Sequence, residues 1–192
     1  MRLHITGDSL AARFEGVDEP MLNHLLKQKI ADLEVTNTAV SGNTTRDLLK
    51  RLNRDILSKP APDWFFLLIG ANDLASHKQV PLVEFKKNLG KLLLAIQAAY
   101  PQANLCLISP PPVDESKQEY RRNQTIETYV SAMEEISEEF SCSLINLYQL
   151  FQEVDVALSV LMDGLAHDGL HFGKVGYDLL ATVMLDVMDR HI

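Results

Sequence analysis

Four short segments of the chain carry the types of side chain that serine-based ester hydrolysis requires. They are residues 7–10 (Gly-Asp-Ser-Leu), 41–45 (Ser-Gly-Asn-Thr-Thr), 70–73 (Gly-Ala-Asn-Asp) and 168–171 (Asp-Gly-Leu-His). Ser9 is the candidate nucleophile and His171 the candidate general base, with Asp168 three residues earlier to orient its imidazole. Gly42 and Asn72 are candidate donors to the negative charge that acyl transfer builds on a carbonyl oxygen.

Each segment also has an ordinary structural interpretation when it is taken alone. Ser9 and the aspartate before it are typical helix caps, and Asn72 with the aspartate after it can cap a following helix. Gly42 can supply a positive φ in a turn. Residues 168–171 can form a polar turn that enters a helix. The catalytic interpretation therefore requires that the elements between the segments bring all four together.

Short β-rich runs alternate along the chain with segments of helical period. Several runs are almost continuously apolar, as is typical of parallel strands that helices cover on both faces. Five strands are predicted, at residues 2–6, 33–39, 63–69, 103–109 and 141–147. The alternation predicts an α/β fold, a three-layer α/β/α sandwich with a flavodoxin-like central parallel sheet of about five strands. No linker or repeat interrupts it, so residues 1–192 are predicted to form a single domain.

Four helices are predicted between and after these strands. They cover residues 48–56, 82–100, 120–140 and 175–187. Apolar side chains recur in them at helical spacing, and Thr44 or Thr45 is the expected cap of the first. Three of the four chemical segments directly follow predicted strands, where open parallel sheets gather their ligand-binding loops. The fourth precedes the last helix and is expected to fold back beside the others.

Composition restricts the class of protein. With 46% hydrophobic and 23% charged residues among 192, the chain has the profile of one globular domain with a sizeable core. Its formal net charge of −8 opposes binding to nucleic acid and to anionic lipid, so neither a nucleic-acid partner nor stable membrane association is expected. Cys106 and Cys142 lie in apolar segments and are predicted to be reduced thiols. A strand-like start without a secretory signal predicts a cytoplasmic location.

Motifs of several other enzyme classes do not match. The chain has no Gly-x-Ser-x-Gly elbow, no Gly-x-Gly-x-x-Gly fingerprint and no Cys-x-x-Cys pair. Residues 169–175 resemble a P-loop weakly, but the glycine spacing is one residue short and valine replaces the magnesium-binding hydroxyl. His167 lies next to Asp168 and His171, yet a glycine disfavours a helix there and no fourth ligand is near, so no metal site is predicted. The other histidines are expected at the core edge or on the surface: His4, His24, His77 and His191.

Taken together, the four segments resemble the SGNH, or GDSL-type, hydrolase family, and the resemblance spans residues 7–171. In that family the oxyanion donors are the serine N–H, the glycine N–H and the asparagine side-chain amide. The resemblance implies that Ser9, Gly42 and Asn72 fill these roles here. The chain departs from the family pattern in two places. Residues 11–13 are Ala-Ala-Arg where relatives usually carry Thr and a nearby Gly, and Ala39 stands where they often have glycine, but neither change removes a catalytic group.

The predicted reaction is hydrolysis of a carboxylic ester through an acyl-enzyme on Ser9, with water as the second substrate and without a cofactor. Residues 110–113, Pro-Pro-Pro-Val, are expected to form a stiff apolar wall that favours a short or medium acyl group, such as an acetyl ester of an alcohol or sugar. Lysophospholipid or thioester hydrolysis is an alternative within the family. A non-catalytic ligand-binding domain on the same fold is the alternative from another class. The oligomeric state stays open.

Overall fold

The computed structural model describes residues 1–190, which contain a sheet of five parallel strands. The strands are β1 (Arg2–Gly7), β2 (Glu34–Asn37), β3 (Trp64–Leu68), β4 (Asn104–Ile108) and β5 (Ser143–Ile145). Each lies on a segment that the sequence predicts to be a strand. They are arranged in the order β2-β1-β3-β4-β5, which is the order of flavodoxin-like sheets.

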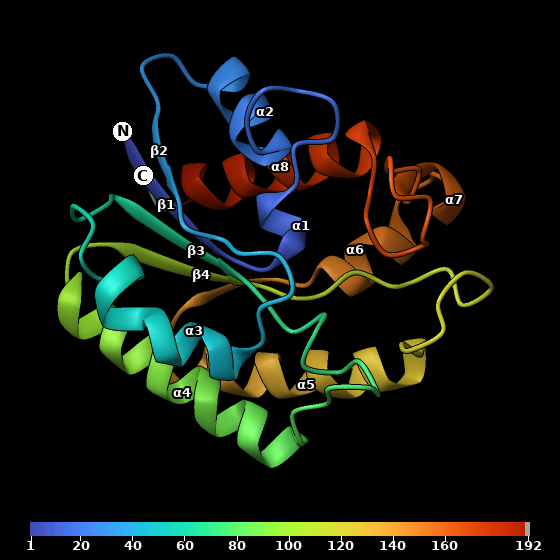
Figure 1. The fold of residues 1–192 in the computed structure, drawn as a ribbon. Coiled ribbons are helices and arrows are strands. Elements are labelled where there is room, and N and C mark those ends of the chain that lie inside the picture. The colour runs from blue at the N-terminus through green and yellow to red at the C-terminus, as the bar shows by residue number, and fades with distance from the viewer. Residues whose placement is uncertain (191–192) are drawn as a thin grey trace.

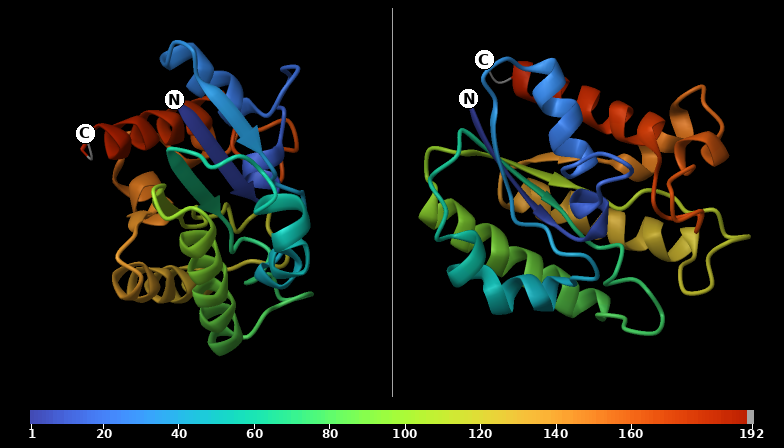
Figure 2. Two further views of the ribbon diagram at one scale, coloured as in Figure 1. Left: turned by 90° about the vertical axis from the view of Figure 1, so that its left-hand side faces the viewer. Right: turned by 45° about the horizontal axis from the view of Figure 1, so that its top comes forward.

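Helices cover both faces of this sheet. They are α1 (Ser9–Ala12), α2 (Met21–Lys29), α3 (Thr45–Arg51), the π-helix η1 (Leu52–Ile56), α4 (Leu82–Ala99), α5 (Asn123–Glu139), α6 (Leu147–Glu153), α7 (Leu158–Leu161) and α8 (Lys174–Asp189). Figure 1 shows α2 and α8 on one side of the sheet and α3, α4 and α5 on the other, and the turned views of Figure 2 agree. The predicted three-layer α/β/α sandwich is therefore confirmed.

The long helices bury a single apolar stripe each. In α4 the buried side chains recur three or four residues apart, as in Phe85, Leu89, Leu92 and Ile96. Such a stripe faces the sheet, because residues at this spacing lie on one side of a helix. Within residues 1–190, no helix combines the length and the apolar character needed to cross a membrane.

Local polar contacts set several helix ends. Thr44 is the cap of α3, as predicted, and its backbone N–H donates to the Asp47 carboxylate at 3.1 Å in a capping box. Helix α6 begins inside the predicted fifth strand, because the Asn146 side chain accepts the N–H of Gln149 at 2.9 Å and caps a helix there. Helices α1, α2, α6 and α7 are additional to the four predicted from the sequence.

The core corrects one prediction about a histidine. His4 is fully buried rather than at the core edge or on the surface, because β1 is an interior strand with β2 and β3 on either side. Its Nε2 lies 2.9 Å from the Thr38 hydroxyl oxygen, and its ring packs against Phe65. Burial lowers the pKa of His4 to about 4, so the ring is neutral at neutral pH.

The two cysteines are free thiols, as predicted from their apolar surroundings. Cys106 is buried in β4, and Cys142 is half-buried just before β5. Burial raises the pKa of both thiols, that of Cys142 to about 11, so both stay protonated at neutral pH.

Candidate active site

The loop after β1 presents Ser9 at the carboxyl edge of the sheet. Gly7 has a φ of +150°, and a Cβ there would lie 1.8 Å from the carbonyl oxygen of Leu68, so the chain can leave the strand this way only at a glycine. The Asp8 carboxylate caps α1 by accepting the N–H of Leu10 at 2.9 Å. The capping role therefore belongs to Asp8, and the hydroxyl of Ser9 is directed to a different partner.

That partner is His171, from the opposite end of the chain. Ser9 Oγ lies 2.8 Å from His171 Nε2, and His171 Nδ1 lies 2.7 Å from Asp168 Oδ2. The second oxygen of Asp168 accepts the backbone N–H groups of Leu170 and His171, each at 3.0 Å. The three predicted catalytic side chains thus form one hydrogen-bonded line, with the imidazole between the hydroxyl and the carboxylate.

The surroundings of this line favour an ionised carboxylate and a neutral imidazole. Burial raises the pKa of Asp168, but the N–H groups of His171 and Leu170 and the imidazole outweigh that effect, so the pKa lies below its ordinary value. Burial lowers the pKa of His171 and Asp168 offsets only part of the shift, so it stays below the ordinary 6.5. At neutral pH the imidazole is therefore in the form that accepts a proton.

Asn72 reaches the same place from the loop after β3. It is 6% exposed, and its Nδ2 donates to the carbonyl oxygen of Asn43 at 3.0 Å. The alternative role as a helix cap does not apply, because the next helix, α4, begins only at Leu82. The neighbouring Asp73 instead accepts the N–H and the hydroxyl of Thr45, at 2.9 and 2.6 Å, and so fixes the start of α3.

Gly42 lies in the loop between β2 and α3. Its φ of +82° places it in a turn that the N–H of Asn43 closes by donating to the carbonyl of Val40 at 3.1 Å. The expected positive φ is therefore present. Gly42 also lines the same cavity as Ser9 and Asn72. Its role in the turn is therefore compatible with a role as an oxyanion donor.

All five predicted site residues line one open cavity of about 300 Å³. Its lining consists of Ser9, Arg13, Ser41, Gly42, Asn72, Arg121, Asp168, Leu170 and His171. The apolar wall expected from residues 110–113 is absent from this lining. Those residues are buried, and the Pro110 ring lies against Gly70 beneath the site.

The sequence reasoning missed two arginines that line the cavity. Arg13 follows α1 and donates to Glu15, and Arg121 lies in the loop before α5. The sequence analysis places Arg121 inside a helix at residues 120–140. In the structure this helix begins only at Asn123, so Arg121 lies in the loop before it. The loop after the fourth strand also lies at the carboxyl edge of the sheet, where ligand-binding loops gather. This position is the signal that could have identified Arg121 as a candidate.

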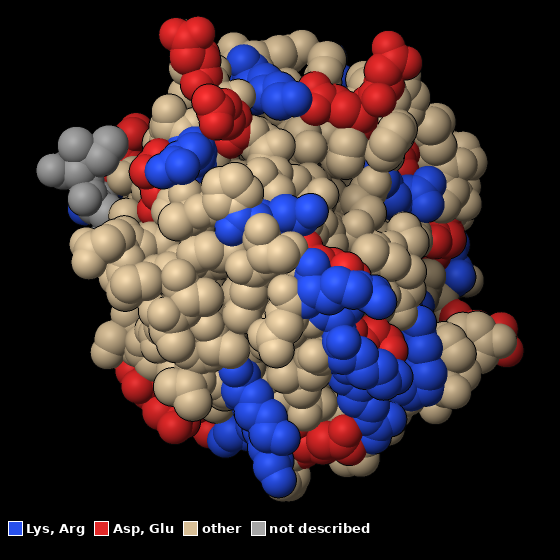
Figure 3. Space-filling view, turned by 60° about the vertical axis from the view of Figure 1, so that its left-hand side comes forward, with Lys and Arg blue, Asp and Glu red and all other residues tan. Residues whose placement is uncertain are grey.

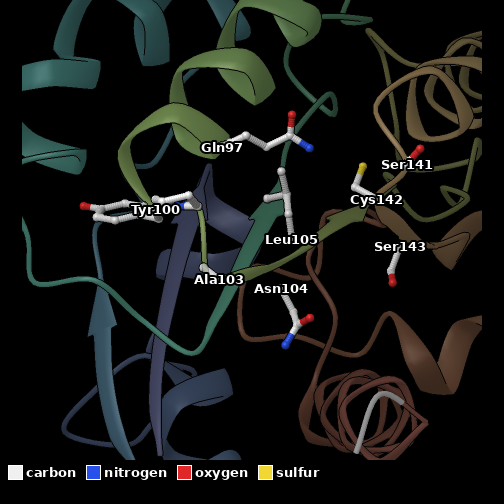
Figure 4. A pocket seen from close by; sticks show the side chains of 9 residues that line it. Gln97, Tyr100, Ala103, Asn104, Leu105, Ser141, Cys142 and Ser143 are labelled. Carbon is white, nitrogen blue, oxygen red and sulfur yellow. The ribbon is translucent and has the colours of Figure 1, made fainter.

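A second cavity lies at the opposite, amino edge of the sheet. Gln97, Tyr100, Leu105 and Cys142 are among the residues that line its volume of about 330 Å³ (Figure 4). The Cys142 thiol is protonated at neutral pH, so it is a poor nucleophile there. The hydrogen-bonded Ser9–His171 pair distinguishes the cavity at the carboxyl edge as the candidate active site.

Charged side chains on the surface are mixed rather than separated. Figure 3 shows a face on which Lys and Arg gather in one area, with Asp and Glu side chains among them. Exposed ion pairs of the molecule include those between Arg46 and Glu84 and between Arg54 and Asp55, both at 2.6 Å. Such pairs reduce the positive charge that is left for a phosphate backbone.

Known proteins match this chain over most of its length. The GDSL-like lipase/acylhydrolase family matches residues 5–179. An acetylxylan esterase from Geobacillus stearothermophilus is 28% identical over 161 residues, covering 80% of this chain and 71% of that protein. An isoamyl acetate-hydrolyzing esterase from Schizosaccharomyces pombe is 29% identical over 201 residues, covering 98% of this chain and 75% of that protein.

A solved structure agrees with the fold. The crystal structure of a lipase/acylhydrolase from Enterococcus faecalis has a TM-score of 0.85 and 29% identity, and the match covers 100% of this chain and 97% of that chain. The resemblance carried by the four segments is confirmed by the family match over residues 5–179. The chain belongs to the GDSL-like lipase/acylhydrolase family and is a carboxylic ester hydrolase.

Proposed function

We propose that the chain hydrolyses small carboxylic esters through an acyl-enzyme on Ser9. The observation that carries the proposal is the hydrogen-bonded line from Ser9 Oγ through His171 to Asp168, with distances of 2.8 and 2.7 Å. A serine hydroxyl is a weak nucleophile until an adjacent base removes its proton, and this line supplies such a base together with the group that orients it.

The first half of the reaction forms the acyl-enzyme. Ser9 Oγ attacks the ester carbonyl carbon as His171 Nε2 takes the hydroxyl proton, and Asp168 stabilises the imidazolium that results. The tetrahedral intermediate then collapses, the bond to the alcohol breaks, and His171 returns the proton to the departing alkoxide. In the second half His171 activates water, which attacks the acyl group and releases the acid and the free serine.

Three donors are proposed to stabilise the oxyanion in both halves. They are the backbone N–H of Ser9, the backbone N–H of Gly42 and the side-chain amide of Asn72. The N–H of Ser9 is in the first turn of α1, where helical N–H groups have no acceptor within the helix. Asn72 Nδ2 carries two hydrogens, so one remains for a ligand after the bond to Asn43.

We propose a short acyl group, with acetyl esters of alcohols or sugars as the first choice. Two relatives support this choice by name, an acetylxylan esterase and an isoamyl acetate-hydrolyzing esterase. The volume of the cavity, about 300 Å³, is at the small end for ligand sites, which suits a small ester better than a long acyl chain.

The proposal also covers the organisation and location of the enzyme. One continuous hydrophobic core runs from the first strand to the last helix, which supports a single domain over residues 1–192. The free thiols of Cys106 and Cys142 support a cytoplasmic location. No nucleic acid and no stable membrane association are part of the proposed function.

Hydrolysis of p-nitrophenyl acetate, butyrate and octanoate by the wild type and Ser9→Ala tests this function. Activity is expected to be highest on the shorter esters and to fall by about 10⁴-fold or more in Ser9→Ala. Ser131→Ala, an exposed serine on α5, is the matched control and is expected to keep full activity. Circular dichroism confirms equal folding of the three proteins.

Other outcomes separate the alternatives. Preference for the octanoate ester, for lysophosphatidylcholine or for an acyl thioester, lost in Ser9→Ala, would contradict the short acyl group but keep the nucleophile. Activity that survives in Ser9→Ala would contradict the mechanism. A ligand that binds without being cleaved, equally well to Ser9→Ala, would support the non-catalytic alternative.

A further inference from the structure

Arg121 is a buried arginine that contacts the loop carrying Asn72. It is 8% exposed and lies just before α5, in the loop that follows β4. Its Nε donates to the carbonyl of Ala71 at 2.7 Å, and its Nη2 donates to Asn72 Oδ1 at 3.2 Å. The Nε and Nη2 atoms of one rigid, planar group therefore bind two consecutive residues of the loop after β3.

This contact determines which way the Asn72 amide faces. A guanidinium group has only donors, so the atom of Asn72 that it binds must be the oxygen. The nitrogen is then the atom that donates to the carbonyl of Asn43, and Asn72 lines the cavity together with Ser9. Without Arg121 the amide is free to turn over, and it would then present a carbonyl-type oxygen to a developing negative charge.

Arg121 also connects this loop with the loop that carries the base. Its Nη1 donates to Gln118 Oε1 at 3.0 Å, and Gln118 Nε2 donates to the backbone carbonyl of Asp168. Gln118 is also 8% exposed, so its bond to Arg121 is buried, and its bond to Asp168 is partly buried. Close by, the N–H of Asp114 donates to the carbonyl of Gly169 at 2.9 Å. The loop before α5 thus holds the oxyanion side and the base side of the site in one arrangement.

Charge adds to this positioning effect. The three bonds of Arg121 that involve Ala71, Asn72 and Gln118 use neutral oxygens, and the carboxyl groups of Asp8 and Asp168 act on its charge without a hydrogen bond to it. A buried positive charge behind Asn72 polarises the amide and favours negative charge on the cavity side of it.

We propose that Arg121 is a positioning residue for the oxyanion hole, because it holds the Asn72 amide with its nitrogen toward the cavity. This inference rests on the proposed function, in which Asn72 is an oxyanion donor. The inference adds Arg121, from the loop after β4, to the residues predicted to form the site. Arg121 would act through Asn72 rather than on the substrate.

A double-mutant cycle between Arg121 and Asn72 tests the proposal. Arg121→Met is expected to lower kcat on p-nitrophenyl acetate by about 10- to 100-fold with a smaller change in KM, because the lost group acts on the transition state. In an Asn72→Ala background the same substitution is expected to lower kcat by less than about 3-fold, since the group that Arg121 positions is already gone.

Two further variants separate orientation from charge and from folding. Arg121→Lys keeps the charge but replaces the rigid, planar guanidinium with a single ammonium group on a flexible stem, so it no longer fixes Ala71 and Asn72 in one geometry and is expected to lose most of the same activity while folding normally. Arg54→Met removes an exposed arginine on η1 and is expected to leave kcat unchanged. Thermal unfolding of every variant shows whether a loss of kcat merely follows a loss of fold.

A spectroscopic readout tests the orientation without relying on activity. The side-chain amide resonances of Asn72, assigned by their absence from Asn72→Ala, are expected to shift or broaden in Arg121→Lys and to stay in place in Arg54→Met. Unchanged resonances, or equal kcat losses from Arg121→Met in both backgrounds, would overturn the positioning role alone. Full activity of Asn72→Ala would instead remove the oxyanion role and, with it, that part of the proposed function.

Discussion

Ser9 Oγ and His171 Nε2 lie 2.8 Å apart, although 162 positions separate the two residues in the chain. Ser9 opens α1 at the end of the first strand, and His171 lies just before the last helix. A second contact links the same two regions, because the hydroxyl of Tyr177 in α8 donates to the carbonyl of Leu10 in α1 at 2.9 Å. The packing of the last helix thus supports the alignment of nucleophile and base.

The pH dependence of activity follows from the protonation of His171. Because its pKa lies below 6.5, kcat/KM is expected to stay level from neutral pH down to that pKa and to fall below it, where the imidazole is protonated and cannot accept the serine proton. A profile with p-nitrophenyl acetate measures this limb. An acid limb centred above 6.5 would contradict the assignment of His171 as the base.

Asp168 is expected to act through the same imidazole. Asp168→Asn should lower kcat by about 10³- to 10⁴-fold, because the amide favours the wrong tautomer and no longer stabilises the imidazolium. The loss of a carboxylate should also move the acid limb further down in pH, since Asp168 raises the pKa of His171. Asp155→Asn, an exposed aspartate outside the cavity, is the matched control, and an equal effect of both substitutions would exclude the role of Asp168.

Asn72→Ala is expected to lower kcat by about 10²- to 10³-fold with little change in KM, as for other oxyanion donors. Steady-state kinetics on p-nitrophenyl acetate measures the split between the two constants. Asn53→Ala changes an exposed asparagine on η1 in the same way and should have no effect. Unchanged turnover in Asn72→Ala would remove this residue from the site.

Two glycines are expected to respond to alanine in opposite ways. Gly7→Ala should lower the free energy of unfolding by about 3 kcal/mol or more, because the new Cβ would lie 1.8 Å from the Leu68 carbonyl oxygen. Gly90→Ala in α4 should raise it by about 0.5–1 kcal/mol, since its Cβ would meet the Phe140 ring at an ordinary 3.5 Å. Urea unfolding measures both changes, and a fully stable Gly7→Ala would contradict the account of the turn after β1.

Most of the fold and all five proposed site residues could be predicted from the sequence. Apolar runs that alternate with segments of helical period predict a parallel sheet. The loops that follow its strands all lie at the carboxyl edge of the sheet, so their residues lie close together. Ser9, Gly42 and Asn72 each follow a strand closely, so their meeting does not depend on exact helix boundaries. The structure brings them together with Asp168 and His171 around one cavity.

The rest depended on tertiary detail that residue types do not encode. Arg121 lies only two positions before α5 begins, so a small error in the predicted helix start moved it from a loop into a helix. Arg121 and Asn72 are 49 positions apart in the sequence, and no local sequence pattern predicts their contact. The prediction for His4 is wrong for a related reason. The order of the strands places β1 inside the sheet, and the residues of β1 alone do not reveal that order.

Covalent capture of the nucleophile tests the central claim most directly. Diethyl p-nitrophenyl phosphate transfers its phosphoryl group to an activated serine, and peptide mass spectrometry then locates the adduct. The account predicts modification of Ser9 in the wild type, with loss of esterase activity in proportion, and strong suppression of labelling in His171→Ala. Inactivation with the adduct on another residue, or esterase activity that persists when Ser9 is fully modified, would contradict an acyl-enzyme on Ser9.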